Sequence, residues 1–197
     1  MAVFTRGFGG HHPEADRPLP PGQHLTADFP VLSAGPTPNV DASRWELTVR
    51  TESGAEHRWD WAGLQAMPAE DVTVDIHCVT RWSKHDTRWR GVPVDAFFED
   101  VETAADFVVA HSYGGYTTNV PLDDLLDGRA WVAYEYEGDP LEPVHGGPVR
   151  LLVPHLYFWK SAKWLRGLTL HEHDEPGFWE QNGYHLYGDP WSEQRYS

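Results

Sequence analysis

The sequence predicts one domain of the mixed α+β class, and three observations lead to this fold class. Its segments of alternating polar and apolar residues are short, as half-buried strands are. Its helical candidates are also short, and they are too irregularly placed to form repeated βαβ units. The chain has 197 residues, a natural length for one domain with one sizeable core.

Five strands are expected after an irregular beginning. The first two alternating segments are residues 45–49 and 71–76, and further strands are expected at 107–110, 131–136 and 149–153. Because successive side chains of a strand lie on opposite faces, the alternation gives each segment one apolar face for a core.

Short helices are expected at residues 61–67, 94–100 and 121–127, the last with Pro121 at its first helical position. Residues 137–139 form a tight hairpin after strand 131–136. A second turn, Val144-His145-Gly146-Gly147-Pro148, precedes the last strand. Its two glycines allow the backbone to approach a ligand closely, although an ordinary turn explains the same residues.

Residues 1–30 mix Gly, His, Pro and charged residues without periodicity, so we expect an irregular N-terminal arm. Residues 31–197 are expected to form a single domain, since no internal repeat and no linker divides them. The arm has room to pack over this domain.

The charge balance excludes several classes of partner. Lys and Arg number 15 against 30 Asp and Glu, a formal net charge of −15. This field repels polyanions and anionic membrane surfaces, which argues against nucleic-acid and peripheral-membrane roles. No segment approaches the roughly 18 apolar residues of a membrane span, and the first residues lack an apolar signal segment. We therefore expect a cytoplasmic protein.

The scarce positive charge is concentrated in two clusters. Eight of the 15 cationic residues lie in two short stretches: Arg81, Lys84, Arg88 and Arg90, then Arg150, Lys160, Lys163 and Arg166. Such clusters suit a pocket for a phosphate or pyrophosphate. Pairing with the surplus Asp and Glu is the alternative.

Cys78 is the only cysteine, which rules out an internal disulfide and a multi-cysteine metal cage. It precedes the first cationic cluster at a strand end, where sites are often built. Its neighbours His77, Arg81 and Lys84 would lower the pKa of the thiol and favour a nucleophile or a soft-metal ligand. A buried, inert thiol is the alternative.

The remaining sequence motifs do not indicate a metal, nucleotide or hydrolase site. His171-Glu172-His173-Asp174 would place two imidazoles on one strand face, but without a third ligand a solvated strand end is favoured, and His11-His12 belong to the arm. Neither the Rossmann and P-loop glycine patterns nor the hydrolase G-x-S-x-G pattern occurs. Nicotinamide, ATP and serine-hydrolase functions thus lose their best evidence.

Two later segments carry a family resemblance. His145-Gly146-Gly147-Pro148-Val149-Arg150, followed by Lys160-Ser161-Ala162-Lys163-Trp164, resembles the pterin-binding signature of the sulfite oxidase molybdopterin-binding domain. The stretch 133–141 and the place of Cys78 are similar to that family too. The resemblance extends from about Val31 to the C-terminus. The tail 177–191 resembles a subgroup of small cytoplasmic bacterial members.

The resemblance implies a three-layered α+β fold of β-sheets with peripheral helices, and a molybdenum-molybdopterin cofactor. Cys78 would then be the protein ligand to molybdenum, a role that suits a soft, donating thiolate. The residues implied to bind the pterin and its phosphate are Leu32, Ser33, Ala34, Ser112, His145, Arg150, Ser161, Ala162 and Lys163.

The departures from the family concern the substrate. Animal and plant sulfite oxidases have an Arg-Asn-His run where this chain has Ser33-Ala34-Gly35, and arginine pairs where it has Thr80-Arg81-Trp82. A sulfite dianion needs several surrounding cations, so sulfite itself is disfavoured. Haem and dimerisation domains do not fit in this length, so electrons would pass to or from a separate protein.

The hypothesis is a molybdenum-pterin oxidoreductase that transfers an oxygen atom between water and a small sulfur or nitrogen oxide. Arg81 and Lys84 would attract the oxide, and Trp82 would form a wall of the pocket. The alternatives are a non-catalytic domain that binds a pterin or another phosphorylated ligand, and a thiol enzyme with Cys78 as nucleophile.

Overall fold

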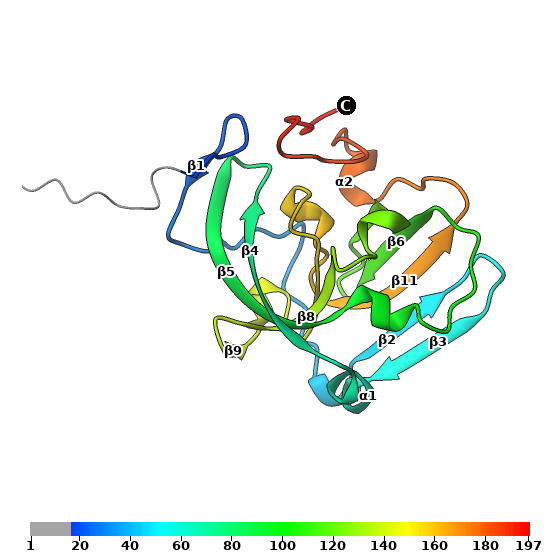
Figure 1. Cartoon of the computed structure of the whole chain (residues 1–197). Helices are drawn as coiled ribbons and strands as arrows, with labels where there is room; N and C mark the ends of the chain where they lie inside the picture. Colours follow the sequence, from blue (N-terminus) through cyan, green and yellow to red (C-terminus); the bar gives the residue numbers. More distant parts are fainter. Residues whose placement is uncertain (1–16) are drawn as a thin grey trace, which may run out of the picture.

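Two β-sheets and a few short helices make up residues 17–197, the part of the chain that this computed structural model describes (Figure 1). The expected α+β class, with sheets and short peripheral helices, is confirmed. His11-His12 and the beginning of the expected arm, residues 1–16, lie outside the described residues.

One sheet has five strands, in the order β3 (Glu56–Asp60), β2 (Glu46–Arg50), β11 (Leu165–His171), β6 (Phe107–Ser112) and β7 (Thr117–Pro121). β2 and β11 are parallel and the other neighbours are antiparallel. β2 buries Leu47 and Val49 and exposes Glu46 and Arg50, as its alternation predicts. The sheet thus has one face in the core.

The other sheet has six strands. The order β1 (His24–Leu25), β5 (Trp82–Pro93), β8 (Trp131–Tyr136) and β10 (Arg150–Leu152) forms its path, with β4 (Glu70–His77) paired to β5 and β9 (Asp139–Pro140) to β8. The 12-residue β5 pairs with β1, β4 and β8. The hairpin of β4 and β5 ends in a turn that contains Cys78.

The helices are short. α1 (Trp61–Ala66) begins at Asp60, whose carboxylate accepts from the Gly63 amide at 2.7 Å, a typical N-cap. α2 (Phe178–Gln181) lies near the C-terminus. The helices expected at 94–100 and 121–127 are instead single 3₁₀ turns, η3 (Val94–Phe97) and η4 (Leu122–Asp124), beside η2 (Ala42–Arg44), η5 (Pro143–His145) and η6 (Phe158–Lys160). Residues 17–197 contain no helix with the length and apolar character needed to cross a bilayer.

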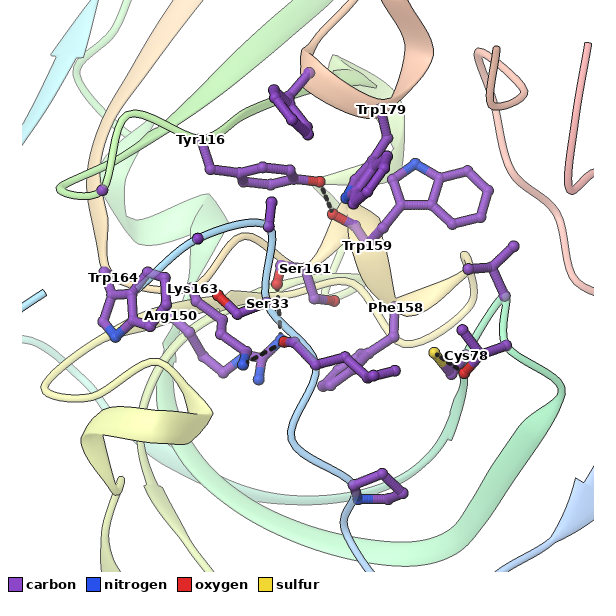
Figure 2. A pocket seen from close by; sticks show the side chains of 18 of the residues that line it. Ser33, Cys78, Tyr116, Arg150, Phe158, Trp159, Ser161, Lys163, Trp164 and Trp179 are labelled. Carbon is purple, nitrogen blue, oxygen red and sulfur yellow. Dashed lines mark hydrogen bonds between the residues drawn. The ribbon is translucent and has the colours of Figure 1, made fainter. Parts of the chain in front are cut away.

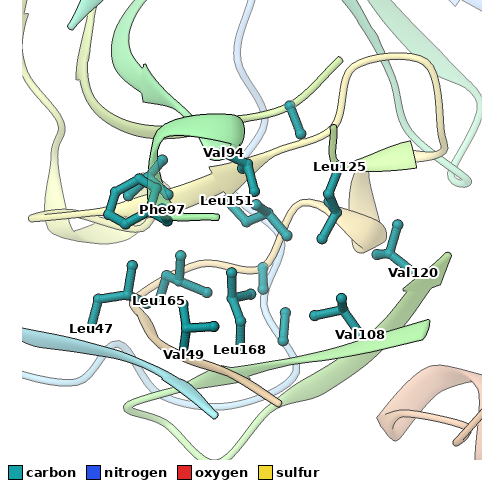
Figure 3. Close-up of a cluster of buried hydrophobic side chains, with 14 of the residues drawn as sticks. Leu47, Val49, Val94, Phe97, Val108, Val120, Leu125, Leu151, Leu165 and Leu168 are labelled. Atoms are coloured by element: carbon teal, nitrogen blue, oxygen red, sulfur yellow. The ribbon is translucent and has the colours of Figure 1, made fainter. Parts of the chain in front are cut away.

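The main core lies between the two sheets (Figure 3). Its fully buried side chains come from both sheets and from the 3₁₀ turns, and include Leu47, Val49, Val94, Phe97, Val108, Val120, Leu125, Leu151, Leu165 and Leu168. A second cluster, rich in aromatic residues, surrounds Cys78 against the six-stranded sheet. A cavity borders this second cluster and shares Cys78, Trp82 and Phe158 with it.

The described part of the arm packs on the domain. Arg17 forms ion pairs with Asp75 at 2.5 Å and Asp86 at 2.7 Å. His24 and Leu25 then pair in parallel with the first residues of β5. The N-terminal segment from Arg17 onward therefore extends the six-stranded sheet.

Candidate functional site

A cavity of about 420 Å³ opens where five segments of the chain meet (Figure 2). These segments are residues 29–36, the turn after β4, the hairpin between β6 and β7, residues 150–164, and α2 with the residues that follow it. The wall is largely aromatic, formed by Phe29, Trp82, Tyr116, Phe158, Trp159, Trp164, Phe178, Trp179 and Tyr184. Such walls suit a large flat ligand.

Cys78 lines one end of the cavity, and local backbone bonds explain its place. Its amide donates to the Trp82 carbonyl at 2.8 Å, and the Arg81 amide donates to the Cys78 carbonyl at 3.0 Å, which closes a tight turn. Cys78 is 7 % exposed, and its Sγ lies 3.2 Å from the Thr80 hydroxyl. Cys78 is the free thiol on this wall.

Burial raises the pKa of the Cys78 thiol, and the Thr80 contact and the charge of Arg195 oppose this rise only in part. The expectation of a lowered pKa is therefore wrong for the ligand-free protein. The reason is that Arg81 has an exposed side chain and that Lys84 donates to the Ala27 carbonyl instead of approaching the sulfur.

The cationic side chains of the cavity lie away from Cys78, at its other end (Figure 2). The fully buried Arg150 guanidinium donates to the carbonyl oxygens of His145 at 2.8 Å and Ser161 at 2.7 Å, and it stacks over the Phe158 ring at 4.1 Å. Within residues 17–197, no carboxylate forms an ion pair with it. Burial lowers the pKa of Arg150 to about 9. A bound anion would compensate this buried charge.

Lys163 stands beside Arg150. Its Nζ donates to the carbonyl oxygens of Leu32 and Val144, both at 2.7 Å. Burial, with the nearby Arg150 charge, lowers its pKa to about 8. Lys163 thus ties the loop 29–36 to the cavity wall and adds a second positive charge.

The structure brings most of the residues predicted to bind the cofactor to this cavity. Those that line it are Leu32, Ser33, Ala34, Cys78, Arg150, Ser161 and Lys163. Ser112 and His145 do not line it, but each has a buried polar atom, Oγ and Nδ1, without a hydrogen-bond partner among the described residues. The His145 ring stacks at 4.0 Å on Phe29, a wall residue. Ala162 is instead buried in the main core.

Arg81 and Lys84, predicted to attract the substrate, do not line the cavity. The sequence left two interpretations of the cationic clusters, an anion pocket and pairing with acidic residues, and each applies to some of the cations. Arg88, Arg90 and Lys160 pair with acidic residues, at 2.8 Å to Glu137, 3.0 Å to Asp71 and 2.7 Å to Glu180. Arg150 and Lys163 face the cavity. Sequence proximity could not separate these roles, because pairing depends on strands distant in the chain.

The glycines of the turn 144–148 approach the chain itself. A Cβ on Gly147 would lie 1.9 Å from the Leu141 carbonyl oxygen, and one on Gly146, whose φ is +109°, would lie 3.0 Å from the Lys163 Cβ. The turn therefore packs between Leu141 on one side and Lys163 and Arg150, the cations of the cavity, on the other. Its glycines position the cationic end of the cavity.

Residues 17–197 contain no cluster of three or more His, Cys, Asp or Glu arranged to hold a metal. β11 ends at His171, so the His171-Glu172-His173-Asp174 segment lies at a strand end, as expected. Asp174 instead accepts from the Asn119 amide at 2.6 Å.

Several wall residues were not identified from the sequence. Phe29 lies in the segment assigned to the arm, and Tyr116, Phe158 and the pair Phe178-Trp179 come from a hairpin, a 3₁₀ turn and a helix. The abundance of aromatic residues was the available signal. It could not separate cavity walls from ordinary packing.

Comparisons with known proteins agree with this geometry. The sequence model of the family described as "Oxidoreductase molybdopterin binding domain" matches residues 34–179. The chain is 44 % identical to "Uncharacterized oxidoreductase YuiH" of Bacillus subtilis over 91 % of this chain and 92 % of that protein. It is 27 % identical to "Putative protein-methionine-sulfoxide reductase subunit YedZ1" of Azospira oryzae, covering 87 % of this chain and 67 % of that protein.

More distant relatives are longer than this chain. Mitochondrial sulfite oxidase of Drosophila melanogaster is 27 % identical over 79 % of this chain and 32 % of its own length. The fold is similar to that of the sulfane dehydrogenase SoxCD from Paracoccus pantotrophus, with a TM-score of 0.64 and 15 % identity over 75 % of this chain and 42 % of that one. Family match and fold agree, and the chain belongs to the oxidoreductase molybdopterin-binding domain family, as a sulfite-oxidase-like, molybdopterin-dependent oxidoreductase.

Proposed function

We propose that this oxidoreductase transfers an oxygen atom between water and a small sulfur or nitrogen oxide, with Cys78 as the protein ligand to molybdenum. One observation carries the proposal. The cavity has a single buried thiol at one end and two cations at the other, the fully buried Arg150 and the half-buried Lys163. This separation suits a cofactor with a metal at one end and a phosphate at the other.

The described residues fit molybdopterin. Arg150 has donors and an uncompensated charge for the phosphate, and Lys163 adds a second cation. Ser112 and His145 each have an unpaired buried polar atom, and the fused rings would lie among the aromatic walls. Ser161 and the backbone of 32–34 would complete the cradle.

When bound, molybdenum supplies a two-electron redox couple and open positions for oxygen ligands. The chain supplies the environment. Burial keeps the Cys78 thiol protonated in the ligand-free protein, so its proton must leave when a metal binds. Trp82 and Phe158 are buried wall residues of the cavity and would restrict the access of water to it.

The substrate is proposed to be an uncharged oxide, such as a sulfoxide or an N-oxide. Near Cys78 the wall is formed by Val79, Thr80, Trp82 and aromatic rings, and its described residues include no cation once Arg150 and Lys163 are assigned to the phosphate. A dianion such as sulfite would lose its hydration without compensating charges. The name of the Azospira relative, a putative protein-methionine-sulfoxide reductase subunit, supports the same substrate class.

We further propose that a separate protein donates or accepts the electrons, because that relative is named as a subunit. A cytoplasmic location is part of the same proposal. Fractionation of cells that express the full-length chain, with a pull-down of redox proteins from each fraction, tests both statements.

The test of the reaction uses protein expressed with molybdate and a reduced viologen as artificial electron donor. Sulfoxides and N-oxides should oxidise the dye, and sulfite should not reduce an artificial acceptor at a comparable rate. Faster turnover of sulfite would contradict the proposed substrate class. Loaded protein without turnover of any oxide would favour a non-catalytic domain. The raised pKa of Cys78 disfavours a thiol nucleophile.

A further inference from the structure

The turn that carries Cys78 accepts hydrogen bonds from the N-terminal segment, through Gln23, and from the C-terminal segment, through Arg195. Gln23 Nε2 donates to the Cys78 carbonyl oxygen at 2.9 Å, and Arg195 Nη1 donates to the Val79 carbonyl oxygen at 2.5 Å. Arg195 Nη2 also donates to the Pro21 carbonyl oxygen at 3.1 Å. One guanidinium thus joins the two terminal segments to the turn. Figure 1 shows the red C-terminal segment near β1 and the end of the β4–β5 hairpin.

Arg195 is buried although only Tyr196 and Ser197 follow it in the sequence. It is 5 % exposed, and its guanidinium lies 5.0 Å from the centre of the Tyr157 ring. The carboxylate that it contacts, Glu193, is partly exposed and 3.4 Å away. Burial of a guanidinium costs free energy that hydrogen bonds must offset. Here the carbonyls of the Cys78 turn and of Pro21 accept those bonds.

The turn itself needs external support. Arg81 has a φ of +77°, in the left-handed region that residues with a Cβ seldom adopt. The amide of His24, the first residue of β1, donates to the Arg81 carbonyl at 2.9 Å, so the N-terminal segment fixes this residue as well. A strained conformation persists only where its surroundings hold it.

We propose that Arg195 and Gln23 are positioning residues that hold the Cys78 turn in the conformation in which the thiolate binds molybdenum. The inference rests on the proposed role of Cys78. It goes beyond the family match, because both residues lie outside residues 34–179.

The test compares Arg195→Met, Arg195→Lys and Gln23→Leu with the parent protein. Gln194→Ala is the matched control, because Gln194 accepts from the Asp189 amide at 3.0 Å within the same tail and does not touch the turn. The first measurement is the hydrogen-exchange rate of the Cys78 and Arg81 backbone amides in the metal-free protein. We expect exchange at these amides to accelerate roughly tenfold or more in Arg195→Met, since charge-assisted hydrogen bonds are lost. Gln23→Leu should show a smaller acceleration.

The loaded protein gives a second readout. The electron paramagnetic resonance signal of the half-reduced metal should shift in Arg195→Met, and Arg195→Lys should restore it in part, because a lysine replaces the charge but not both donors. Gln194→Ala should match the parent in both measurements.

Unchanged amide exchange and an unchanged resonance signal in Arg195→Met would overturn the proposal. If that variant fails to fold, Gln23→Leu and Arg195→Lys decide by the same criteria. Failure of the proposed function is distinguishable, because it would appear as parent protein without molybdenum or without turnover, while amide exchange in the metal-free protein depends on neither.

Discussion

At the residue scale, a buried charge that has no oppositely charged partner within the protein indicates where a charged ligand could bind. Arg150 is 1 % exposed and is held by carbonyl oxygens, whereas the buried Lys160 has Glu180 at 2.7 Å. The two cations are close in the sequence but differ in their partners. Lys160 is neutralised within the fold, whereas we propose that the charge of Arg150 is compensated by a bound anion.

The pKa of Lys163, which burial lowers to about 8, gives a pH prediction. A bound anion stabilises the protonated amine, so anion affinity is full below about pH 8 and falls as the pH rises through that value. We expect the affinity of metal-free protein for sulfate, which stays dianionic, to drop several-fold from pH 7 to pH 9 in calorimetric titrations. Lys163→Met should bind more weakly and lose most of this slope, with a remainder near pH 9 from Arg150. A flat profile in the parent would contradict the assignment.

The sequence predicts the ends of the cavity better than its walls. Cys78, Arg150, Ser161 and Lys163 belong to an ordered series whose resemblance to a family is specific, and all four line the cavity. Arg81 and Lys84 were assigned by proximity to Cys78. Proximity failed because the tight turn directs Arg81 to solvent and because Lys84 bonds to the Ala27 carbonyl.

At the element scale, the turn 144–148 positions the cationic end through close backbone packing. Gly147→Ala would place a Cβ 1.9 Å from the Leu141 carbonyl oxygen, which is backbone and cannot rotate away. We expect a loss of about 1 to 3 kcal/mol in the free energy of unfolding by urea. Gly35→Ala is the control, since its Cβ would meet nothing within 4 Å. Equal stability of the two variants would show that the turn is not tightly packed.

The Lys160–Glu180 pair anchors α2 and the segment after it. Lys160 also donates to the Asn119 and Leu186 carbonyls, and both side chains of the pair are fully buried. Lys160→Met leaves the Glu180 charge uncompensated, which should cost about 3 to 5 kcal/mol of unfolding free energy.

Urea unfolding of the double variant Lys160→Met, Glu180→Leu tests this reasoning, because removal of both charges should recover most of the loss. Arg58→Met, at the exposed pair with Glu56, is the control and should change stability little. If the double variant were as unstable as Lys160→Met alone, the loss of stability would come from lost packing contacts and not from the uncompensated charge of Glu180.

The elements that the sequence predicts are those with clear alternation or turn chemistry, such as β2, β8 and α1. β5 was not predicted, and of β11 only the end near His171 was expected. β5 includes Lys84, His85, Asp86 and Thr87 in succession, so its partners rather than its pattern specify a strand. β11 lies in the centre of its sheet, and its pairing depends on strands distant in the sequence.

At the scale of the whole molecule, the cavity joins segments from most of the chain. Residues 29–36, the Cys78 turn and α2 are separated in the sequence and meet only when the chain folds. A ligand that binds there selectively stabilises the folded state, by about 4 kcal/mol when its concentration is a thousand times its dissociation constant.

We therefore expect loaded protein to melt roughly 10 °C above metal-free protein, since each kcal/mol shifts the midpoint of a chain this size by about 2 to 4 °C. Differential scanning calorimetry of both forms measures the shift. Arg150→Met should reduce it by weakening cofactor binding. Identical midpoints for loaded and metal-free parent protein would mean that the cofactor does not bind in this cavity.

The central claim is that Cys78 holds molybdenum, and elemental analysis of protein expressed with molybdate tests it most directly. Purified parent protein should contain close to one molybdenum per chain, and Cys78→Ser should contain little while keeping its metal-free melting temperature. Unchanged molybdenum in Cys78→Ser, or a parent that binds pterin without metal, would contradict the account.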